Sequence, residues 1–313
     1  MRIGSRVRWA VLGAVVFALA LGVGVLLRRA TSAGERPRGS DRRPLRLGLP
    51  SSFPAEIARR ELAGLARYLQ RELGRPVELV VPPTYESLRR ELLRGELDLA
   101  NLPPLQFVLA RRQHPGLKGL VTSTYDGASR YQSFLITRQE SPIVTLQDLR
   151  GRRVCYVDPG STSGYLLPRH FLRQRGLDPD TLFSSVRFSG NHLAVMQDVL
   201  RGRCDVGAIY SIAFLGASRN GVAGPRLRMV AVAGQLPYDV FCASPGLDER
   251  TARRFAEALL SLDPRRELGR SNLGPTFRIN GFVRPDISQY DVVDRAARQE
   301  GALDTASLAR LSP

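Results

Sequence analysis

From residue 45 onward, apolar positions recur along the chain with two different periods. Short apolar runs predict strands at 45–49, 77–81 and 97–100. Between them, apolar residues recur every three or four positions, which predicts helices at 54–73 and 85–94. This order of strands and helices is typical of βαβ units.

A second series of the same kind follows further along the chain. It has predicted strands at 153–157, 185–188 and 206–209, with helices at 163–174 and 193–201. Helices of this length between strands favour right-handed crossovers and largely parallel sheets. We therefore expect an α/β protein with two lobes.

The two series share a short internal repeat. Residues 84–100 (TYESLRRELLRGELDLA) align without gaps with residues 191–207 (NHLAVMQDVLRGRCDVG), at an offset of 107. The alignment pairs Tyr85 with His192, each after a strand and at the start of a helix. Open α/β sheets bind ligands at the carboxyl ends of their strands, so both residues are predicted to face one cleft. The alternative is that the match reflects only the common pattern of α/β proteins.

The first 44 residues differ in character from the rest. Residues 9–27 carry no charge and are flanked on both sides by arginines. This run is longer than a typical signal-peptide core and close to the length that spans a bilayer. It predicts either a cleaved signal peptide or a membrane anchor within residues 1–30, and hence an extracytoplasmic protein. Residues 31–44, rich in Arg, Ser, Gly and Pro, are predicted to be a linker.

The formal net charge of +17 is unevenly distributed. Residues 1–43 hold nine Arg against Glu35 and Asp41, which accounts for +7 and leaves +10 for the rest. The remaining arginines are scattered, with no basic run interleaved with aromatic residues, so we expect no nucleic-acid partner. A small anion or an anionic lipid surface remains compatible with this charge.

Three cysteines, Cys155, Cys204 and Cys242, lie in apolar strand-like stretches. They are too few for a disulfide scaffold or a zinc site, and we expect neither a metal nor a cofactor. The favoured interpretation is that they are small buried side chains. The alternative is that one pair oxidises outside the cytoplasm.

A turn between a predicted strand and helix carries the clearest chemical signal, with the sequence DPGSTSG at 158–164. Helix starts expose backbone N–H groups and a favourable dipole for anions, and Ser161, Thr162 and Ser163 add neutral donors. The glycine spacing also resembles a nucleophile elbow with Thr162 as the nucleophile. A Ser163–His192 dyad is a second catalytic alternative. No histidine follows position 192 and no orienting acid is evident, so we predict an anion site and not an enzyme.

Residues 45–295 resemble the periplasmic phosphate/phosphite/phosphonate-binding proteins of ABC importers. The resemblance rests above all on DLRGRRVCYVDPGSTSGYLLP (148–168) and FSGNHLAVMQDVLRGRCDVGAI (188–209). It implies a bilobal, type II periplasmic-binding-protein-like fold. Lobe I would comprise residues 45–134 and 238–300 and lobe II residues 135–237, followed by a C-terminal tail at 301–313. The hinge is expected near 131–137 and 235–241.

The resemblance also implies roles for particular residues. The ligand-binding residues it implies are Tyr85, Ser161, Thr162, Ser163, His192, Asp239 and Ser52. The three hydroxyl residues would hold the oxyanion, His192 would donate to it, Tyr85 would close over it, and Asp239 would accept from a ligand hydroxyl or amine. Ser51 is a weaker candidate beside Ser52.

The chain departs from the family at three places. Pro103-Pro104 and Phe107 stand where the family often has Gly-Pro and a tyrosine, and Leu193 replaces an acid after the histidine. Loss of that phenol is expected to remove one polar contact from the pocket wall, and loss of the acid makes an amine-bearing ligand less secure.

The resemblance implies a solute-binding protein that delivers phosphonate, phosphite or phosphate to ABC permease subunits. We expect a monomer that is either secreted or attached to the membrane by its N-terminal segment. The alternatives are a ligand-sensing domain of a membrane signalling system and a Ser/Thr hydrolase.

Overall fold

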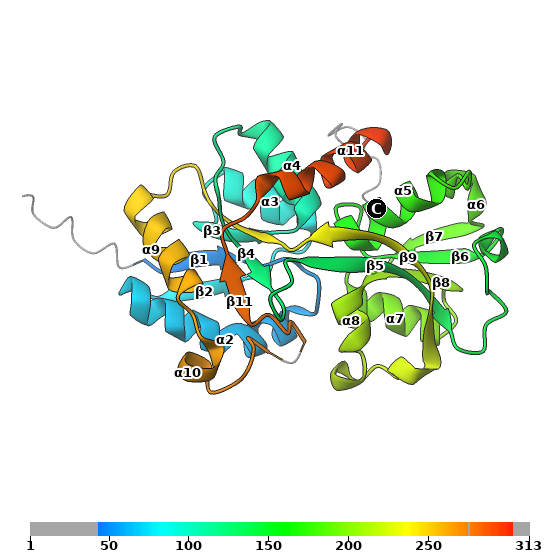
Figure 1. The fold of residues 1–313 in the computed structure, drawn as a ribbon, viewed down its shortest axis with the longest axis horizontal. Helices are drawn as coiled ribbons and strands as arrows, with labels where there is room; N and C mark the ends of the chain where they lie inside the picture. Colours follow the sequence, from blue (N-terminus) through cyan, green and yellow to red (C-terminus); the bar gives the residue numbers. More distant parts are fainter. Residues whose placement is uncertain (1–42, 275, 303–313) are drawn as a thin grey trace, which may run out of the picture. The chain divides into compact units, whose positions relative to one another are not determined.

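The computed structural model describes residues 43–274 and 276–302, and the segment at 9–27 lies outside them. Within this part of the chain, no helix has the length and apolar character needed to cross a bilayer. The fold has two sheets, each with helices on both faces, and therefore two lobes (Figure 1). The predicted two-lobed α/β fold is confirmed.

The first sheet has six strands in the order β11-β4-β10-β3-β1-β2. Its strands are β1 (Leu45–Gly48), β2 (Val77–Val80), β3 (Leu99–Leu102), β4 (Gly119–Thr124), β10 (Val240–Ala243) and β11 (Gly281–Val283). Strand β1 pairs with β2 and β3 in parallel, whereas β10 and β4 enter antiparallel. The sheet is therefore mixed and not largely parallel, because the chain returns from the second lobe to form β10.

The second sheet has five strands in the order β7-β6-β8-β5-β9. Its strands are β5 (Arg130–Arg138), β6 (Arg153–Tyr156), β7 (Ser185–Phe188), β8 (Val206–Tyr210) and β9 (Leu227–Pro237). The β6-β7 and β6-β8 pairs are parallel, and the long β5 and β9 are antiparallel to their neighbours. Strands β5 and β9 pair along their whole length and lie where the chain passes between the lobes (Figure 1).

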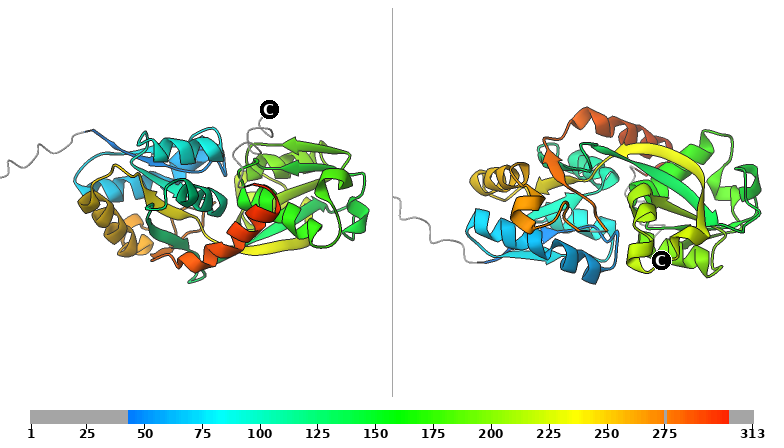
Figure 2. Two further views of the ribbon diagram at one scale, coloured as in Figure 1. Left: turned by 90° about the horizontal axis from the view of Figure 1, so that it is seen from above. Right: turned by 60° about the horizontal axis from the view of Figure 1, so that its bottom comes forward.

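Helices cover both faces of each sheet (Figures 1 and 2). On the first sheet, one face carries α2 (Ala55–Leu73), α9 (Glu249–Leu260) and the short α10 (Pro264–Leu268), and the other carries α3 (Tyr85–Leu93), α4 (Pro104–Gln113) and α11 (Asp291–Gln299). On the second sheet, one face carries α7 (His192–Leu200) and α8 (Ser211–Leu215), and the other carries α5 (Leu167–Arg173) and α6 (Pro179–Leu182). Helix α11 also packs against α5, and so contacts both lobes.

The internal repeat is a repeat of structure as well as of sequence. The parallel registers Arg46↔Glu78 and Arg153↔Ser185 differ by the offset of 107 at both ends. The same holds for Leu47↔Leu99 and Val154↔Val206, and for the bounds of α3 and α7. Strands β1, β2 and β3 with α3 are thus repeated as β6, β7 and β8 with α7. The alternative of a chance match between α/β patterns is not needed.

Two cysteines form a disulfide between Cys155 in β6 and Cys204, which lies two residues before β8 begins. The favoured interpretation of three unpaired cysteines was wrong for these two, because parallel pairing of β6 with β8 brings their Cα atoms to 5.7 Å. Cys242 in β10 is a free, buried thiol. Spacing along the sequence did not show which pair the register would bring together.

Reduction of this disulfide is expected to destabilise the protein. The bond closes a loop of 49 residues, which corresponds to roughly 4 kcal/mol in the chain-entropy description. Thiol titration of the denatured, non-reduced protein should find one thiol, and three after reduction. The midpoint of urea unfolding should fall for a Cys155→Ala, Cys204→Ala variant and stay insensitive to reductant. Three titratable thiols before reduction would contradict the assignment.

Candidate functional site

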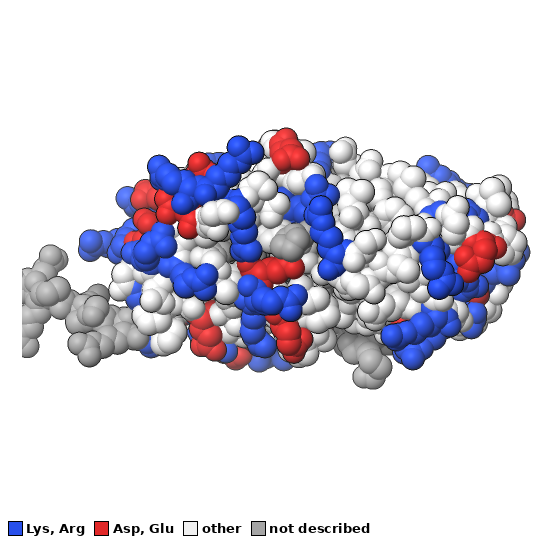
Figure 3. Space-filling model, turned by 90° about the horizontal axis from the view of Figure 1, so that it is seen from below, with Lys and Arg blue, Asp and Glu red and all other residues white. Residues whose placement is uncertain are grey.

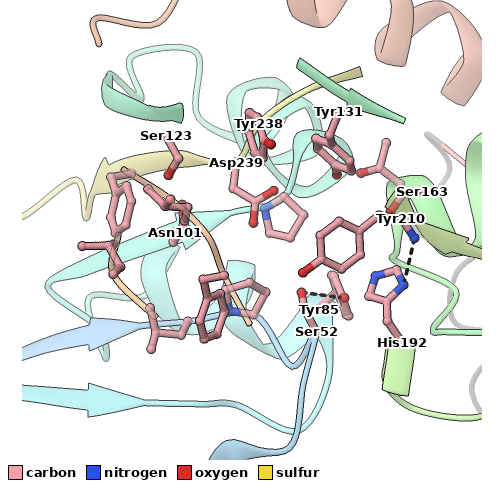
Figure 4. A pocket seen from close by; sticks show the side chains of 18 of the residues that line it. Ser52, Tyr85, Asn101, Ser123, Tyr131, Ser163, His192, Tyr210, Tyr238 and Asp239 are labelled. Atoms are coloured by element: carbon pink, nitrogen blue, oxygen red, sulfur yellow. Dashed lines mark hydrogen bonds between the residues drawn. The ribbon is translucent and has the colours of Figure 1, made fainter. Parts of the chain in front are cut away.

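A pocket with a cavity volume of about 70 Å³ lies at the carboxyl ends of the repeated strands, between the two sheets (Figure 4). All seven residues predicted to bind a ligand line it: Ser52, Tyr85, Ser161, Thr162, Ser163, His192 and Asp239. Ser51 is not among the lining residues. The structure thus brings together residues more than 180 positions apart, and their binding role remains a prediction.

The turn at 158–164 approaches the first lobe closely. A Cβ atom at Gly160 would lie 2.6 Å from the Gln106 amide nitrogen and 3.0 Å from Tyr85, and one at Gly164 would lie 2.4 Å from Val157. Glycine is therefore required at both positions by packing. The spacing that resembled a nucleophile elbow has a structural cause that involves no nucleophile.

A buried side-chain relay fixes this turn from α3 and α4. The Arg89 guanidinium donates to Gln106 Oε1 at 3.0 Å, and Gln106 Nε2 donates to the Gly160 carbonyl at 3.0 Å. Both side chains are almost fully buried. The turn of the second lobe is thus anchored on two helices of the first.

Each hydroxyl of the turn has a defined partner. Ser161 Oγ accepts from the amide three residues further on, at 3.1 Å, and caps the helical segment. Thr162 Oγ1 accepts from the Leu105 amide of α4 at 2.8 Å, and the Ser163 side chain interacts with the Tyr131 phenol, whose pKa burial raises and this contact lowers. A hydroxyl that accepts can still donate its own proton, so Ser161 and Thr162 remain donors.

The segment that follows begins with a π-helical turn, Thr162–Leu166, which continues into α5. The backbone amides of Thr162 and Ser163 are the first two of this segment and have no intrahelical acceptor. π-Helical turns are common at functional sites. Amides and hydroxyls together give the pocket a group of neutral donors at one end.

The paired residues Tyr85 and His192 occupy the first position of α3 and α7. The Tyr85 phenol lies 3.0 Å from the Ser52 hydroxyl, and burial raises its pKa well above the usual range, so it stays protonated. Figure 4 shows Tyr85, Ser52 and His192 close together at one side of the pocket.

The hydrogen bonding of His192 determines which nitrogen carries its proton. The amide of Tyr210 donates to Nδ1 at 3.3 Å, so the proton of the neutral ring is on Nε2. Burial lowers the pKa of His192 to about 3, and the ring is therefore neutral at physiological pH. It can offer one N–H donor but no positive charge.

Two crossed contacts join the lobes at these helix starts. The amide of His192 in α7 donates to the Ser52 carbonyl of the first lobe at 3.1 Å. The Asp158 carboxylate of the second lobe accepts from the amides of Gly160 at 2.6 Å and of Tyr85 in α3. Burial raises the pKa of Asp158 to about 6. The lobes are therefore in direct contact around the pocket.

Asp239, just before β10, is the pocket's carboxyl group. Burial raises its pKa to about 7, and none of the described residues that line the pocket is Lys or Arg. The pocket therefore combines neutral donors with a carboxyl that is near its titration point at neutral pH. Among the residues that the structure describes, no group of three or more His, Cys, Asp or Glu is placed to hold a metal.

Several polar lining residues were missed in the sequence. Three tyrosines, Tyr131, Tyr210 and Tyr238, supply phenols, and Asn101 and Ser123 lie on β3 and β4. The expectation for position 107 was wrong, because the Phe107 ring does not line the pocket and packs against Tyr290 at 5.0 Å. The three tyrosines lie at or next to the ends of β5, β8 and β9. A search for polar aromatic residues at predicted strand ends could have found them in the sequence.

A catalytic dyad is not formed within the described chain. The Ser163 side chain interacts with Tyr131, and His192 accepts at Nδ1 from the Tyr210 backbone amide. No hydrogen bond among the described residues joins Ser163 to His192, and Thr162 Oγ1 accepts from Leu105. The geometry supports binding and gives no activated nucleophile.

Residues 47–290 match the family described as "ABC transporter, phosphonate, periplasmic substrate-binding protein". The chain belongs to this family. The match covers most of the chain and includes every residue of the pocket. The resemblance stated from the sequence is confirmed.

Two proteins with sequence similarity to this chain match only part of it. A phosphate-import protein PhnD from Mycolicibacterium smegmatis is 31% identical over 58% of this chain and 61% of its own length. A tetrathionate sensor histidine kinase from Salmonella typhimurium is 29% identical over 72% of this chain, which spans 40% of the kinase. The chain therefore spans less than two thirds of either relative.

The fold is also that of a solved structure. PhnD1 from Prochlorococcus marinus in complex with methylphosphonate has a TM-score of 0.73 and 20% identity, with 82% of this chain and 98% of that one covered. At this identity the likeness shows a common fold.

The raised pKa of Asp239 makes stability depend on pH. Because the folded-state pKa of about 7 exceeds the ordinary value of 3.8, this group's contribution to the stability of the ligand-free protein is greatest below pH 4 and falls as pH rises through 7. Asp239→Asn should remove this loss of folding stability, which is at most about 4 kcal/mol. At pH 8 the variant should therefore unfold at a higher denaturant concentration than wild type, whereas at pH 4 the two should unfold at the same concentration.

Asp205→Asn provides a control of opposite sign. Hydrogen bonds from Arg153 lower the pKa of Asp205, so its stabilising effect is present at neutral pH and lost in acid. This variant should be less stable than wild type at pH 8. A stability difference between Asp239→Asn and wild type that is the same at pH 4 and pH 8 would show that burial does not shift the pKa of the Asp239 carboxyl.

Proposed function

We propose that this protein is an extracytoplasmic solute-binding protein that captures a phosphorus oxyanion between its lobes and delivers it to an ABC permease. The observation that supports this most directly is the end of the pocket formed by Ser161, Thr162, Ser163 and His192. It offers hydroxyl, amide and imidazole N–H donors to one anionic group. Family membership supports the same function.

Neutral donors suit a protein that must release what it binds. The first amides of the helical segment and the hydroxyls of Ser161 and Thr162 can each contact a phosphonyl oxygen. Tyr85 and His192, at the starts of two helices from different lobes, can approach the same group from two sides. Since the lobes exclude water from the pocket, hydrogen bonds to an anion are strengthened without a fixed positive charge.

Asp239 adds a proton that protein and ligand share. A carboxyl with a pKa near 7 can accept from a P–OH group or donate to a P–O⁻ group, and an anion beside it raises its proton affinity further. Affinity should therefore fall with increasing alkalinity, once both the ligand and Asp239 are ionised. A hydroxyl-bearing monoanion at neutral pH fits this pocket.

The rest of the proposal concerns the cellular context. The uncharged run at 9–27 would export the protein and either be cleaved or remain as an anchor. The partner would be the permease of an importer, the protein would act as a monomer, and it would catalyse no reaction. The lobe boundaries and the hinge near 131–137 and 235–241 belong to this proposal, supported by the course of β5 and β9 between the sheets.

Ligand binding can be tested by thermal unfolding of residues 45–313 with phosphate, phosphite, methylphosphonate and 2-aminoethylphosphonate. A compound at about 100 times its dissociation constant should stabilise the fold by about 2.7 kcal/mol. A Ser163→Ala, His192→Ala variant should lose the shift. His114→Ala is the matched control, because His114 is exposed beyond α4 and outside the pocket. No shift with any phosphorus compound would refute the proposal.

A sensor domain is the second candidate, supported by similarity to the tetrathionate sensor histidine kinase over 72% of the chain. The fold and pocket would then report a ligand to a membrane partner. Tetrathionate added to the same panel separates the two, because a shift with tetrathionate alone would favour the sensor and a shift with phosphorus compounds alone the importer.

A further inference from the structure

Two polar residues lie in the pocket away from the donors that would hold an oxyanion. Asn101 on β3 and Ser123 on β4 flank β10, and the registers Phe241↔Asn101 and Val240↔Thr122 place Asn101, Asp239 and Ser123 on one face of the sheet. Figure 4 shows Asn101 and Ser123 on one side of Asp239, with Ser163 and His192 on the other.

These two side chains are buried and lack partners. Asn101 is 8% exposed and Ser123 is 1% exposed, and among the residues that the structure describes neither Asn101 Oδ1 nor Ser123 Oγ has a hydrogen-bond partner. Buried polar atoms are almost always hydrogen bonded, and leaving them unpaired destabilises the fold. Both line the pocket, so a ligand could supply what the protein does not.

The surroundings of the pair are apolar. The pocket wall on this side is formed by Leu49, Leu62, Leu65, Phe241, Leu273, Phe277 and Ile279. Such a wall gives phosphate or phosphite nothing to contact, whereas it can pack against a carbon substituent. The Asn101 carbonyl oxygen can only accept a hydrogen bond, and the Ser123 hydroxyl can accept one as well, so together they favour a donor carried on carbon.

Residues 271–274 and 276–280, which contribute part of this wall, are held in place against α2. The buried Glu61 carboxylate accepts from the Thr276 amide at 2.9 Å and from its hydroxyl at 2.5 Å. A Cβ atom at Gly274 would lie 2.4 Å from Glu61, so the loop fits closely against α2. The chamber is therefore a fixed part of the pocket.

We propose that Asn101 and Ser123 form a second polar subsite, which receives a hydroxyl or ammonium group on the organic substituent of a phosphonate. This inference rests on the proposed function, because it places the phosphonyl group at Ser161–Ser163. Asp239, between the two ends, can accept from the same substituent or from the phosphonyl hydroxyl. The substrate class is then a phosphonate with a short, donor-bearing carbon chain, and phosphate and methylphosphonate are poorer ligands because they leave both oxygens unpaired.

The test compares ligands of equal size by calorimetry on the protein without its first 44 residues. 2-Aminoethylphosphonate and 2-hydroxyethylphosphonate differ from propylphosphonate only in the last atom of the substituent. At least one of the first two should bind wild type about tenfold or more tightly than propylphosphonate, since a site built for a donor rejects an analogue that lacks it. Methylphosphonate is included as a ligand that reaches only the first subsite.

The variant Asn101→Leu, Ser123→Ala removes both oxygens and keeps the site apolar. It should bring the donor-bearing ligands and propylphosphonate to within about threefold of each other, leave methylphosphonate affinity within about threefold of wild type, and raise the unfolding temperature without ligand. Ser244→Ala, a buried serine outside the pocket, should change none of these ratios.

The outcomes separate the two proposals. Equal binding of propylphosphonate and both donor-bearing isosteres to wild type would overturn the subsite. A variant that loses methylphosphonate and 2-aminoethylphosphonate in the same proportion would overturn it as well. If no phosphonate binds wild type, the proposed function fails first and the subsite with it.

Discussion

The crossed contacts at the starts of α3 and α7 are the constraint on which the pocket depends. The amide of His192 donates to the first lobe and the amide of Tyr85 to Asp158 of the second, so each helix start is held by the opposite lobe. Apolar packing accompanies these contacts, because Phe53 and Tyr85 share a core cluster with Leu193 of the second lobe. The same helix starts carry the Tyr85 and His192 side chains that line the pocket, so the contacts between the lobes also position the proposed binding residues.

The repeated βαβ unit explains how two different lobes reach this arrangement. An offset of 107 relates the strand registers of both units, and at equivalent positions a carboxylate before the third strand, Asp98 or Asp205, accepts from the amide at the start of the first, Arg46 or Arg153. The two units differ at the residues that line the pocket. Equivalent helix starts carry a phenol in one lobe and an imidazole in the other, both neutral, and this gives two donors of different reach. On the face shown in Figure 3, exposed basic side chains lie among acidic ones.

The parts that could be predicted from the sequence are those whose periodicity or turn chemistry is local. Strand 185–188 and the helices at 55–73 and 85–93 were found within a residue or two, and all seven expected pocket residues line one pocket. Strands β4, β10 and β11 were missed because they are antiparallel additions whose partners lie far away in sequence. Asn101 was missed for another reason, since a single polar residue within LANL has the appearance of a strand interior, and only the register reveals that its side chain faces a cavity. The disulfide likewise depended on pairing of β6 with β8.

The distribution of polarity along the pocket bears on how specificity arises without a charged anchor. An arginine or lysine at the anion end would bind any oxyanion strongly and leave little of the discrimination to the rest of the site. In the proposed function, neutral donors at Ser161–Ser163 would bind the common group more weakly, so contacts to the variable part of the ligand would contribute a larger fraction of the affinity. Asp239 disfavours a fully ionised ligand near it, and the unpaired oxygens on β3 and β4 disfavour one that lacks a donor. In such a pocket, polar groups that remain unpaired with the wrong ligand would contribute to selectivity as much as the hydrogen bonds made to the right one.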